Sequence, residues 1–157
     1  MKNKYIVFVI FVLIIAALLF ILYKLDYRYK VLVGIYDSYA LHKLEDELGD
    51  FLYVYDNNQL TKELMREIEG DLEDLNSYIF RSPKLNFMNL YIDDIASYDV
   101  EDINRERIDY CKELYNELKR IRHVINDKKG NSAINTYEYF DKKANENLLK
   151  KYLKIVR

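Results

Sequence analysis

The chain opens with an uninterrupted apolar segment. From Tyr5 to Tyr23 it runs nineteen residues without a charge or a strong helix breaker, and basic residues flank both ends. As a helix rising 1.5 Å per residue, this segment would be about 28 Å long, close to the thickness of a bilayer's hydrocarbon core. The terminal tyrosines suit the membrane interface. The pattern predicts a transmembrane signal-anchor within residues 1–26.

A cleaved signal peptide is the alternative interpretation, since such peptides also begin with basic residues and an apolar run. Two features argue against cleavage. Ala16 and Ala17 lie inside the run, and residues 24–30 contain no small-x-small motif. Basic residues on the two sides of the span nearly balance. A short basic stretch before the span is typical of export-type anchors, so we expect a single-pass cell-membrane protein with an extracytoplasmic soluble domain.

Beyond the span, apolar residues recur at helical spacing. The clearest series alternates steps of three and four and is formed by Leu41, Leu44, Leu48, Phe51 and Tyr55. Such a heptad seam predicts a helix that packs along one side. Its backward extension through Leu32, Ile35, Tyr36 and Tyr39 predicts a helix over residues 27–55, continuous with the span because no proline intervenes. The seam is also a candidate surface for a partner protein or a homodimer.

Further helices are predicted in the remaining residues. Asp56, Asn57 and Asn58 are expected to supply cap and turn chemistry, with Asp56 and Gln59 as a capping box, before a helix that ends at Ser82 and Pro83. A short helix over residues 84–97 follows, and then a longer one over residues 99–126 with Asp99 as its cap. A loop over 127–131 and a final helix over 136–156 complete the chain. The predicted fold class is all-α: one N-terminal transmembrane helix, then a four- to five-helix bundle with coiled-coil-like packing in residues 27–157.

Composition and charge support this architecture. Only four Gly and one Pro punctuate 157 residues, which favours long helices over many strands. Residues 31–102 hold five basic and seventeen acidic residues, and residues 103–157 hold fourteen and eight. We therefore expect basic helices to pack against acidic ones. Abundant Lys, Asn, Ile and Tyr are typical of an AT-rich genome, such as that of a low-GC bacterium or a phage.

The polar residues specify no recognisable chemistry. His42 and His123 are distant in sequence, and the paired Glu-x-x-His motifs of di-metal bundles are missing. Asp93 and Asp94 are adjacent, so on a helix they would point about 100° apart. The sequence contains no phosphate-binding, dinucleotide, nucleophile or zinc motif. We expect no enzyme, no cofactor, no metal, no small-molecule substrate and no nucleic acid. The lone Cys111 cannot form an intramolecular disulfide.

Two features suggest contacts instead. The C-terminal basic residues have two interpretations, contact with anionic lipid or with the acidic helix before them; these residues are Lys142, Lys143, Lys150, Lys151 and Lys154. The sixteen tyrosines suit either a protein interface or the genome composition. The sequence predicts a membrane-anchored, non-catalytic helical module that binds an unidentified partner protein at the membrane surface. The alternative is an immunity- or exclusion-type factor that blocks a toxin or phage component at the membrane.

Overall fold

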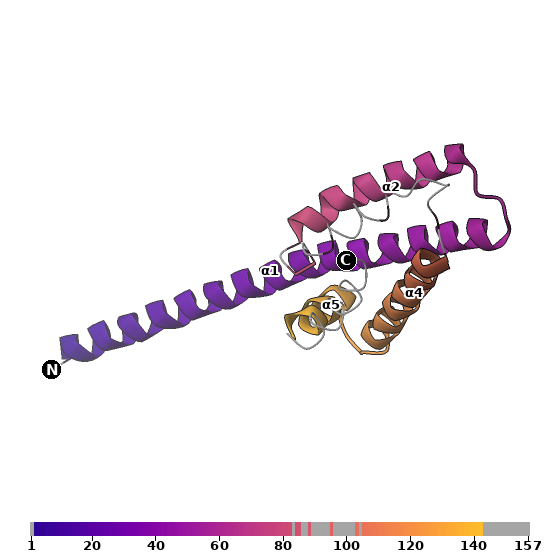
Figure 1. Cartoon of the computed structure of the whole chain (residues 1–157). Coiled ribbons are helices and arrows are strands. Elements are labelled where there is room, and N and C mark those ends of the chain that lie inside the picture. The colour runs from indigo at the N-terminus through magenta and orange to yellow at the C-terminus, as the bar shows by residue number, and fades with distance from the viewer. Residues whose placement is uncertain are drawn as a thin grey trace.

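A single long helix organises the molecule (Figure 1). The computed structural model describes residues 2–82, 84, 85, 88, 95, 103 and 105–142. Its first element, α1 (Lys2–Asp56), is a continuous helix of 55 residues. At 1.5 Å per residue it is about 82 Å long. The predicted continuity between the apolar segment and the following helix is therefore confirmed.

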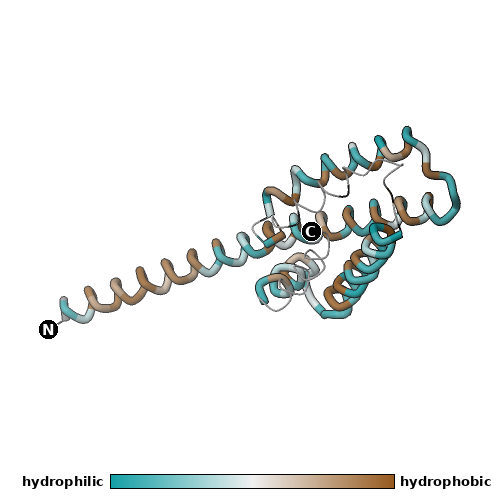
Figure 2. Tube along the Cα trace, in the orientation of Figure 1, coloured by the Kyte–Doolittle hydropathy of each residue, from teal (hydrophilic) through white to brown (hydrophobic). Residues whose placement is uncertain are grey.

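The part of α1 that contains residues 5–23 stands clear of every other described element. All side chains from 4 to 29 are exposed, and most of those between 5 and 23 are large and apolar. Figure 2 shows residues 5–23, which we call the arm, as a nearly unbroken hydrophobic stretch. By length and composition, α1 is the one helix among the described residues that is long and apolar enough to cross a membrane.

The second half of α1 is the spine of a helical bundle. Helices α2 (Lys62–Arg81), α4 (Arg105–Asn126) and α5 (Ser132–Asp141) each pack against α1, and α4 also packs against α5. In Figure 1, α2 lies along one side of α1, whereas α4 and α5 lie along the other. The described elements are all helices. The core between them is filled by large apolar side chains, including Leu44, Leu48, Phe51, Leu72, Leu75, Ile79, Leu114, Leu118, Ile121 and Phe140.

The connection from α1 to α2 differs from the prediction. Asp56 is the last residue of α1, and the N-cap of α2 is Thr61, whose hydroxyl accepts a hydrogen bond from the Leu64 amide at 3.2 Å. The predicted cap at Asp56 is wrong. Helix α1 ends one residue later than the predicted residue 55. Two residues after its end, Asn58 takes a left-handed conformation with φ of 54°. Asparagine tolerates that conformation better than most residues, so the chain turns there.

Helix α5 begins earlier than the sequence predicted. Asn131 caps it, because the side-chain oxygen accepts hydrogen bonds from the amides of Ala133 and Ile134 at 2.9 and 3.3 Å. The predicted start at residue 136 is therefore wrong. The predicted loop is confirmed, with Gly130 at a φ of +118°. Most of the predicted helix over 84–97 lies outside the described residues. The predicted cap at Asp99 and the end of the final helix lie wholly outside them.

Helices α1 and α5 come unusually close at Gly34. A Cβ atom placed on Gly34 would lie only 1.8 Å from the carbonyl oxygen of Ala133. Further along α5, the ring of Tyr137 lies 6.4 Å from that of Tyr29. Later residues of α5 thus meet earlier residues of α1, so α5 runs back toward the apolar arm.

The predicted packing of opposite charges occurs between α4 and α1. Arg122 pairs with Glu45 at 2.9 Å, and Lys112 pairs with Asp56 at 2.9 Å. Both acids belong to the acidic middle of the chain, residues 31–102, and both cations belong to the basic last third. The acidic partner of α4 in these pairs is therefore α1; the predicted contact with the acidic second helix concerned the basic residues of the C-terminal helix.

Candidate functional site

The heptad seam predicted as a contact surface lies inside the bundle. Leu41, Leu44, Leu48 and Phe51 are each at most 2% exposed, and Tyr55 packs against the same core. In the structure these side chains hold the helices of one chain together. A surface for a partner must be sought on another face of α1.

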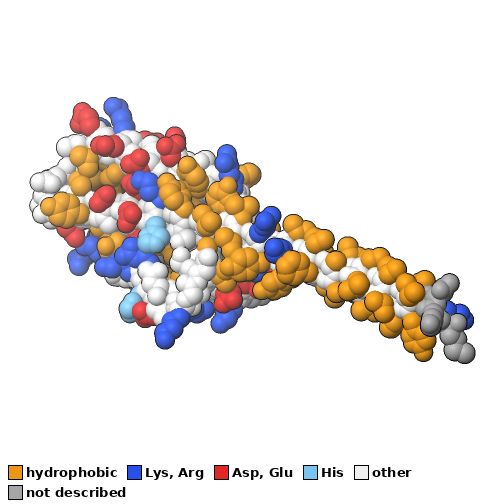
Figure 3. All heavy atoms as spheres, turned by 180° about the vertical axis from the view of Figure 1, so that it is seen from behind, with side chains coloured by type: hydrophobic (Ala, Val, Ile, Leu, Met, Phe, Trp, Pro, Cys, Tyr) orange, Lys and Arg blue, Asp and Glu red, His pale blue; other side chains and the backbone are white. Residues whose placement is uncertain are grey.

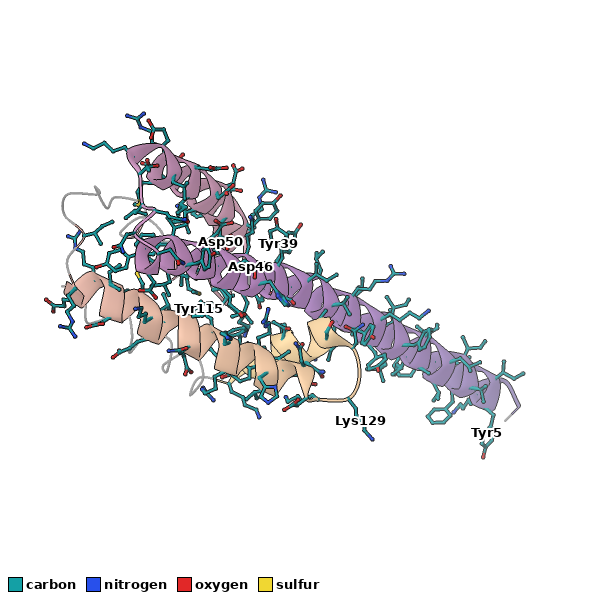
Figure 4. The ribbon with its side chains drawn as sticks, turned by 90° about the vertical axis from the view of Figure 1, so that its right-hand side faces the viewer. Tyr5, Tyr39, Asp46, Asp50, Tyr115 and Lys129 are labelled. Carbon is teal, nitrogen blue, oxygen red and sulfur yellow. The ribbon has the colours of Figure 1, made fainter. Side chains whose placement is uncertain are left out.

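The opposite side of α1 is not covered by the other described helices. Seven exposed residues follow one another there at helical spacing and form what we call the open face; they are Leu32, Ile35, Tyr39, His42, Asp46, Asp50 and Tyr53. Leu32 and Ile35 are 54% and 53% exposed, although both belong to the apolar series that the sequence placed toward the core. Figure 4 labels Tyr39, Asp46 and Asp50 along α1.

Helices α2 and α4 border the open face. On the α2 side, the rings of Tyr39 and Tyr78 pack with their centroids 4.8 Å apart. On the α4 side, Tyr115 lies against α1, since a Cβ atom on Gly49 would be 3.2 Å from its ring (Figure 4). The open face is therefore a strip of α1 flanked by an aromatic side chain on each side.

Charge is divided across this part of the molecule. Seen from behind in Figure 3, acidic side chains gather toward the α2 side of the bundle and basic side chains toward the α4 and α5 side. The cations next to the open face are mostly engaged. Lys43 binds Glu47 at 2.5 Å, a contact that raises the pKa of Lys43.

Two carboxylates of the open face lack such partners. Within the described ranges, Asp46 and Asp50 on α1 make no ion pair, and neither does Asp74 on α2. Lys119 of α4 remains on the other border, with its ammonium 5.1 Å from the centroid of the Tyr115 ring. The open face is thus apolar toward the arm and carries uncompensated negative charge further along α1.

Beside the open face, a charged contact ties α4 to α1. Glu45 is 3% exposed and binds the Arg122 guanidinium through one carboxylate oxygen, whereas its other oxygen, Oε2, is buried without a hydrogen bond. Arg122 also approaches Nδ1 of His42 at 3.4 Å. Removing the guanidinium would leave the Glu45 charge buried and unpaired.

A second buried acid lies where α1 meets the end of α2. Asp37 is fully buried and accepts a hydrogen bond from the hydroxyl of Ser82, the C-cap of α2. Burial raises the pKa of Asp37 to about 6, although Ser82 and the nearby Lys84 oppose the shift. The sequence analysis did not single out Asp37. A signal was available, because Asp37 precedes Leu41 by four residues and so continues the heptad seam.

The remaining candidate residues are placed as follows. Tyr5 and Tyr23 are exposed at the two ends of the apolar segment. Lys142 is exposed just after α5, whereas Lys143, Lys150, Lys151 and Lys154 lie outside the described residues. His42 and His123 are exposed on different helices, and nowhere in the described part of the chain do three or more metal-ligating side chains come together.

The chain matches no protein-family model, no curated protein and no solved structure. Its function is therefore argued from the geometry of α1 and the helices around it.

Proposed function

We propose that this chain is a single-pass, membrane-anchored protein-interaction module without catalytic activity. Residues 5–23 act as an uncleaved signal-anchor, and the bundle binds a partner protein at the membrane surface through the open face. The observation that carries the proposal is the exposed apolar group Leu32, Ile35 and Tyr39, which lies on the same continuous helix as the apolar arm.

The position of this apolar group favours a protein contact over a lipid contact. If Tyr23 marks the edge of the hydrocarbon, Leu32 and Ile35 lie about 14 and 18 Å beyond it along a helix perpendicular to the bilayer. The headgroup region on each side is only about 5–8 Å thick. Both side chains therefore stand in water, where clustered exposed apolar residues typically mark an interaction site.

The proposal also includes the orientation in the membrane and the packing of the seam. The chain is anchored in the cell membrane with its bundle on the extracytoplasmic side, and the seam from Leu41 to Tyr55 packs in a coiled-coil-like manner against the neighbouring helices. A cysteine introduced at the exposed Lys129, in the loop before α5 and in a chain carrying Cys111→Ala, tests the orientation. An impermeant thiol reagent should label it in intact cells. Labelling only after lysis would place the bundle in the cytoplasm.

Photocrosslinking in living cells tests the binding role. A photoreactive amino acid at Ile35 should give one discrete adduct with another protein, because that side chain stands on the open face. The matched control is Glu138, which is exposed on α5, away from the open face, and should give none. If a folded, membrane-inserted chain gives no adduct from Leu32, Ile35 or Tyr39, the proposed function is wrong.

A further inference from the structure

We infer that the partner is itself anchored in the membrane, and that its membrane-proximal helix carries apolar residues followed by basic ones. This inference rests on the proposed function and names the chemistry of the partner. It follows from the order of side chains along the open face, from the pairing of the surrounding charges and from the fixed height of each residue above the bilayer.

The order of side chains is the first step. Toward the arm, the open face presents Leu32, Ile35 and Tyr39, and two to three turns further on it presents Asp46 and Asp50. Tyr39 and Asp46 are seven residues apart, or about 10 Å along the helix. A second helix that leaves the same membrane and lies beside α1 would meet apolar side chains first and carboxylates next.

The charge balance is the second step. Lys43, Arg122 and Lys112 are committed to Glu47, Glu45 and Asp56. Asp46, Asp50 and Asp74 have no such partner within the residues described here, and Lys119 on the α4 border lies over the Tyr115 ring. A basic segment would bring the complementary charge, which favours encounter and fixes register.

The same charges disfavour a second copy of the chain. Two copies anchored in one bilayer are parallel, and a symmetric pair would place each Asp46 and each Asp50 near its own counterpart. Like charges facing each other across a helix contact are destabilising. Arg28 lies on the same side of α1, nearer the arm, and would also face its copy. The apolar residues alone would suit a homodimer, but the charges around them select a basic partner.

A pair of designed probes tests the inference on the full chain. Each probe is a synthetic peptide with a nineteen-residue apolar span, followed by a helix with leucines at the heights of Leu32, Ile35 and Tyr39. One probe then carries lysines, and the other glutamates, at the heights of Asp46 and Asp50. Binding is measured by energy transfer in vesicles of zwitterionic phosphatidylcholine, which removes any attraction to anionic lipid.

We expect the lysine probe to bind at least tenfold more tightly than the glutamate probe. The double variant Asp46→Lys, Asp50→Lys should invert that preference, whereas the control Glu138→Lys should leave it unchanged. All three substituted residues are exposed, so circular dichroism of each variant should match that of the parent chain. Equal binding of the two probes, or a preference that the double variant does not alter, would overturn the inference.

The photocrosslinking experiment at Ile35 distinguishes failure of this inference from failure of the proposed function. An adduct between Ile35 and a protein with a basic membrane-proximal segment supports both. An adduct with a second copy, or with a protein whose membrane-proximal segment is acidic or neutral, overturns the inference about chemistry while a protein contact at the open face stands. The absence of any adduct overturns the proposed function as well.

Discussion

Beyond the arm, the two faces of α1 both carry apolar residues at helical spacing, but they differ in burial. On the inner face Leu41, Leu44 and Leu48 are at most 2% exposed, and on the open face Leu32 and Ile35 are more than half exposed. Both series are apolar with steps of three and four. Apolar periodicity therefore identifies an apolar surface of a helix. It does not show whether the same chain or another molecule covers that surface.

The largest loss of stability is expected from a substitution at Gly34, where α1 and α5 approach most closely. Gly34→Ala would place a Cβ 1.8 Å from the carbonyl oxygen of Ala133, so α1 and α5 must separate. We expect a loss of about 3 kcal/mol in the free energy of unfolding, the upper part of the range for overpacking. Thermal unfolding in a mild detergent, followed by circular dichroism, measures it.

Gly70→Ala is the matched control for that variant. Gly70 lies within α2, and a Cβ there would have no neighbour within 4 Å. The same substitution should therefore stabilise the protein by about 1 kcal/mol through helix propensity. If both variants changed stability equally, the close approach of α1 and α5 would be disproved.

The next effect concerns the contact that holds α4 on α1. Arg122→Ala leaves Glu45 buried and without its cation. Such a loss costs about 3–5 kcal/mol for a fully buried pair, and because the Arg122 side chain is one-third exposed we expect about 2 kcal/mol. The double variant Glu45→Gln, Arg122→Ala should recover part of it. A single variant as stable as the parent would show that the pair does not hold the helices together.

Asp37→Asn gives a smaller effect of opposite sign. Unfolded Asp37 ionises near pH 3.8, but folded Asp37 keeps its proton until about pH 6. Its contribution to stability is therefore full below pH 3.8 and is lost as the pH rises through 6. The variant should be more stable than the parent by about 1–2 kcal/mol at pH 7.5, after allowing for its unpaired amide N–H.

The pH dependence checks the cause of that gain. The advantage of Asp37→Asn should shrink as the pH falls from 6 to 4, because folded Asp37 is already protonated there and ionisation favours the unfolded parent chain less and less as the pH approaches 3.8. Asp46→Asn, the same change on the open face, should alter stability little at any pH. An advantage that stayed constant between pH 4 and 7.5 would refute the assignment to Asp37 ionisation.

The smallest effect sharpens the comparison between the faces. Ile35→Gln should change the free energy of unfolding by less than about 0.5 kcal/mol, since the side chain is exposed. It should nevertheless lower binding of the lysine probe. Leu48→Gln, which places an amide in the core, should instead lower the free energy of unfolding by about 2–3 kcal/mol. Similar unfolding temperatures for the two variants would contradict the division into an inner and an open face.

The sequence predicted which segments are helical better than it predicted where the helices end or which of their faces are buried. The apolar run, the seam and the loop before α5 are strong local signals: the run and the seam are helical in the structure, and the loop is present. The cap of α2 was missed because Asp56, Asn57, Asn58 and Thr61 are all good cap formers, and the choice among them depends on where α1 stops packing. The start of α5 was missed because Asn131, the last residue of the loop, was not recognised as the N-cap of the helix that follows it.

The candidate site depended on tertiary contacts that no local pattern encodes. The apolar spacing predicted core positions for Leu32, Ile35 and Tyr39. These side chains are exposed because α2 and α4 pack on either side of this strip of α1 and do not cover it. Conversely, Asp37 reads as a surface acid, and it is buried because the end of α2 supplies the hydroxyl of Ser82. In both cases the outcome was decided by residues more than forty positions away.

A spin-label scan along α1 of the full chain in lipid bilayers tests the central claim most directly. With Cys111 replaced by alanine, single labels from 5 to 53 report exposure to oxygen in the lipid and to a polar reagent in water. We predict oxygen access on all sides of 5–23, and then, without a break in helical period, water access at 32, 35, 39 and 46 alternating with protection at 33, 41, 44 and 48. A loss of periodicity between 24 and 33, or water access on all sides of 5–23, would contradict the account.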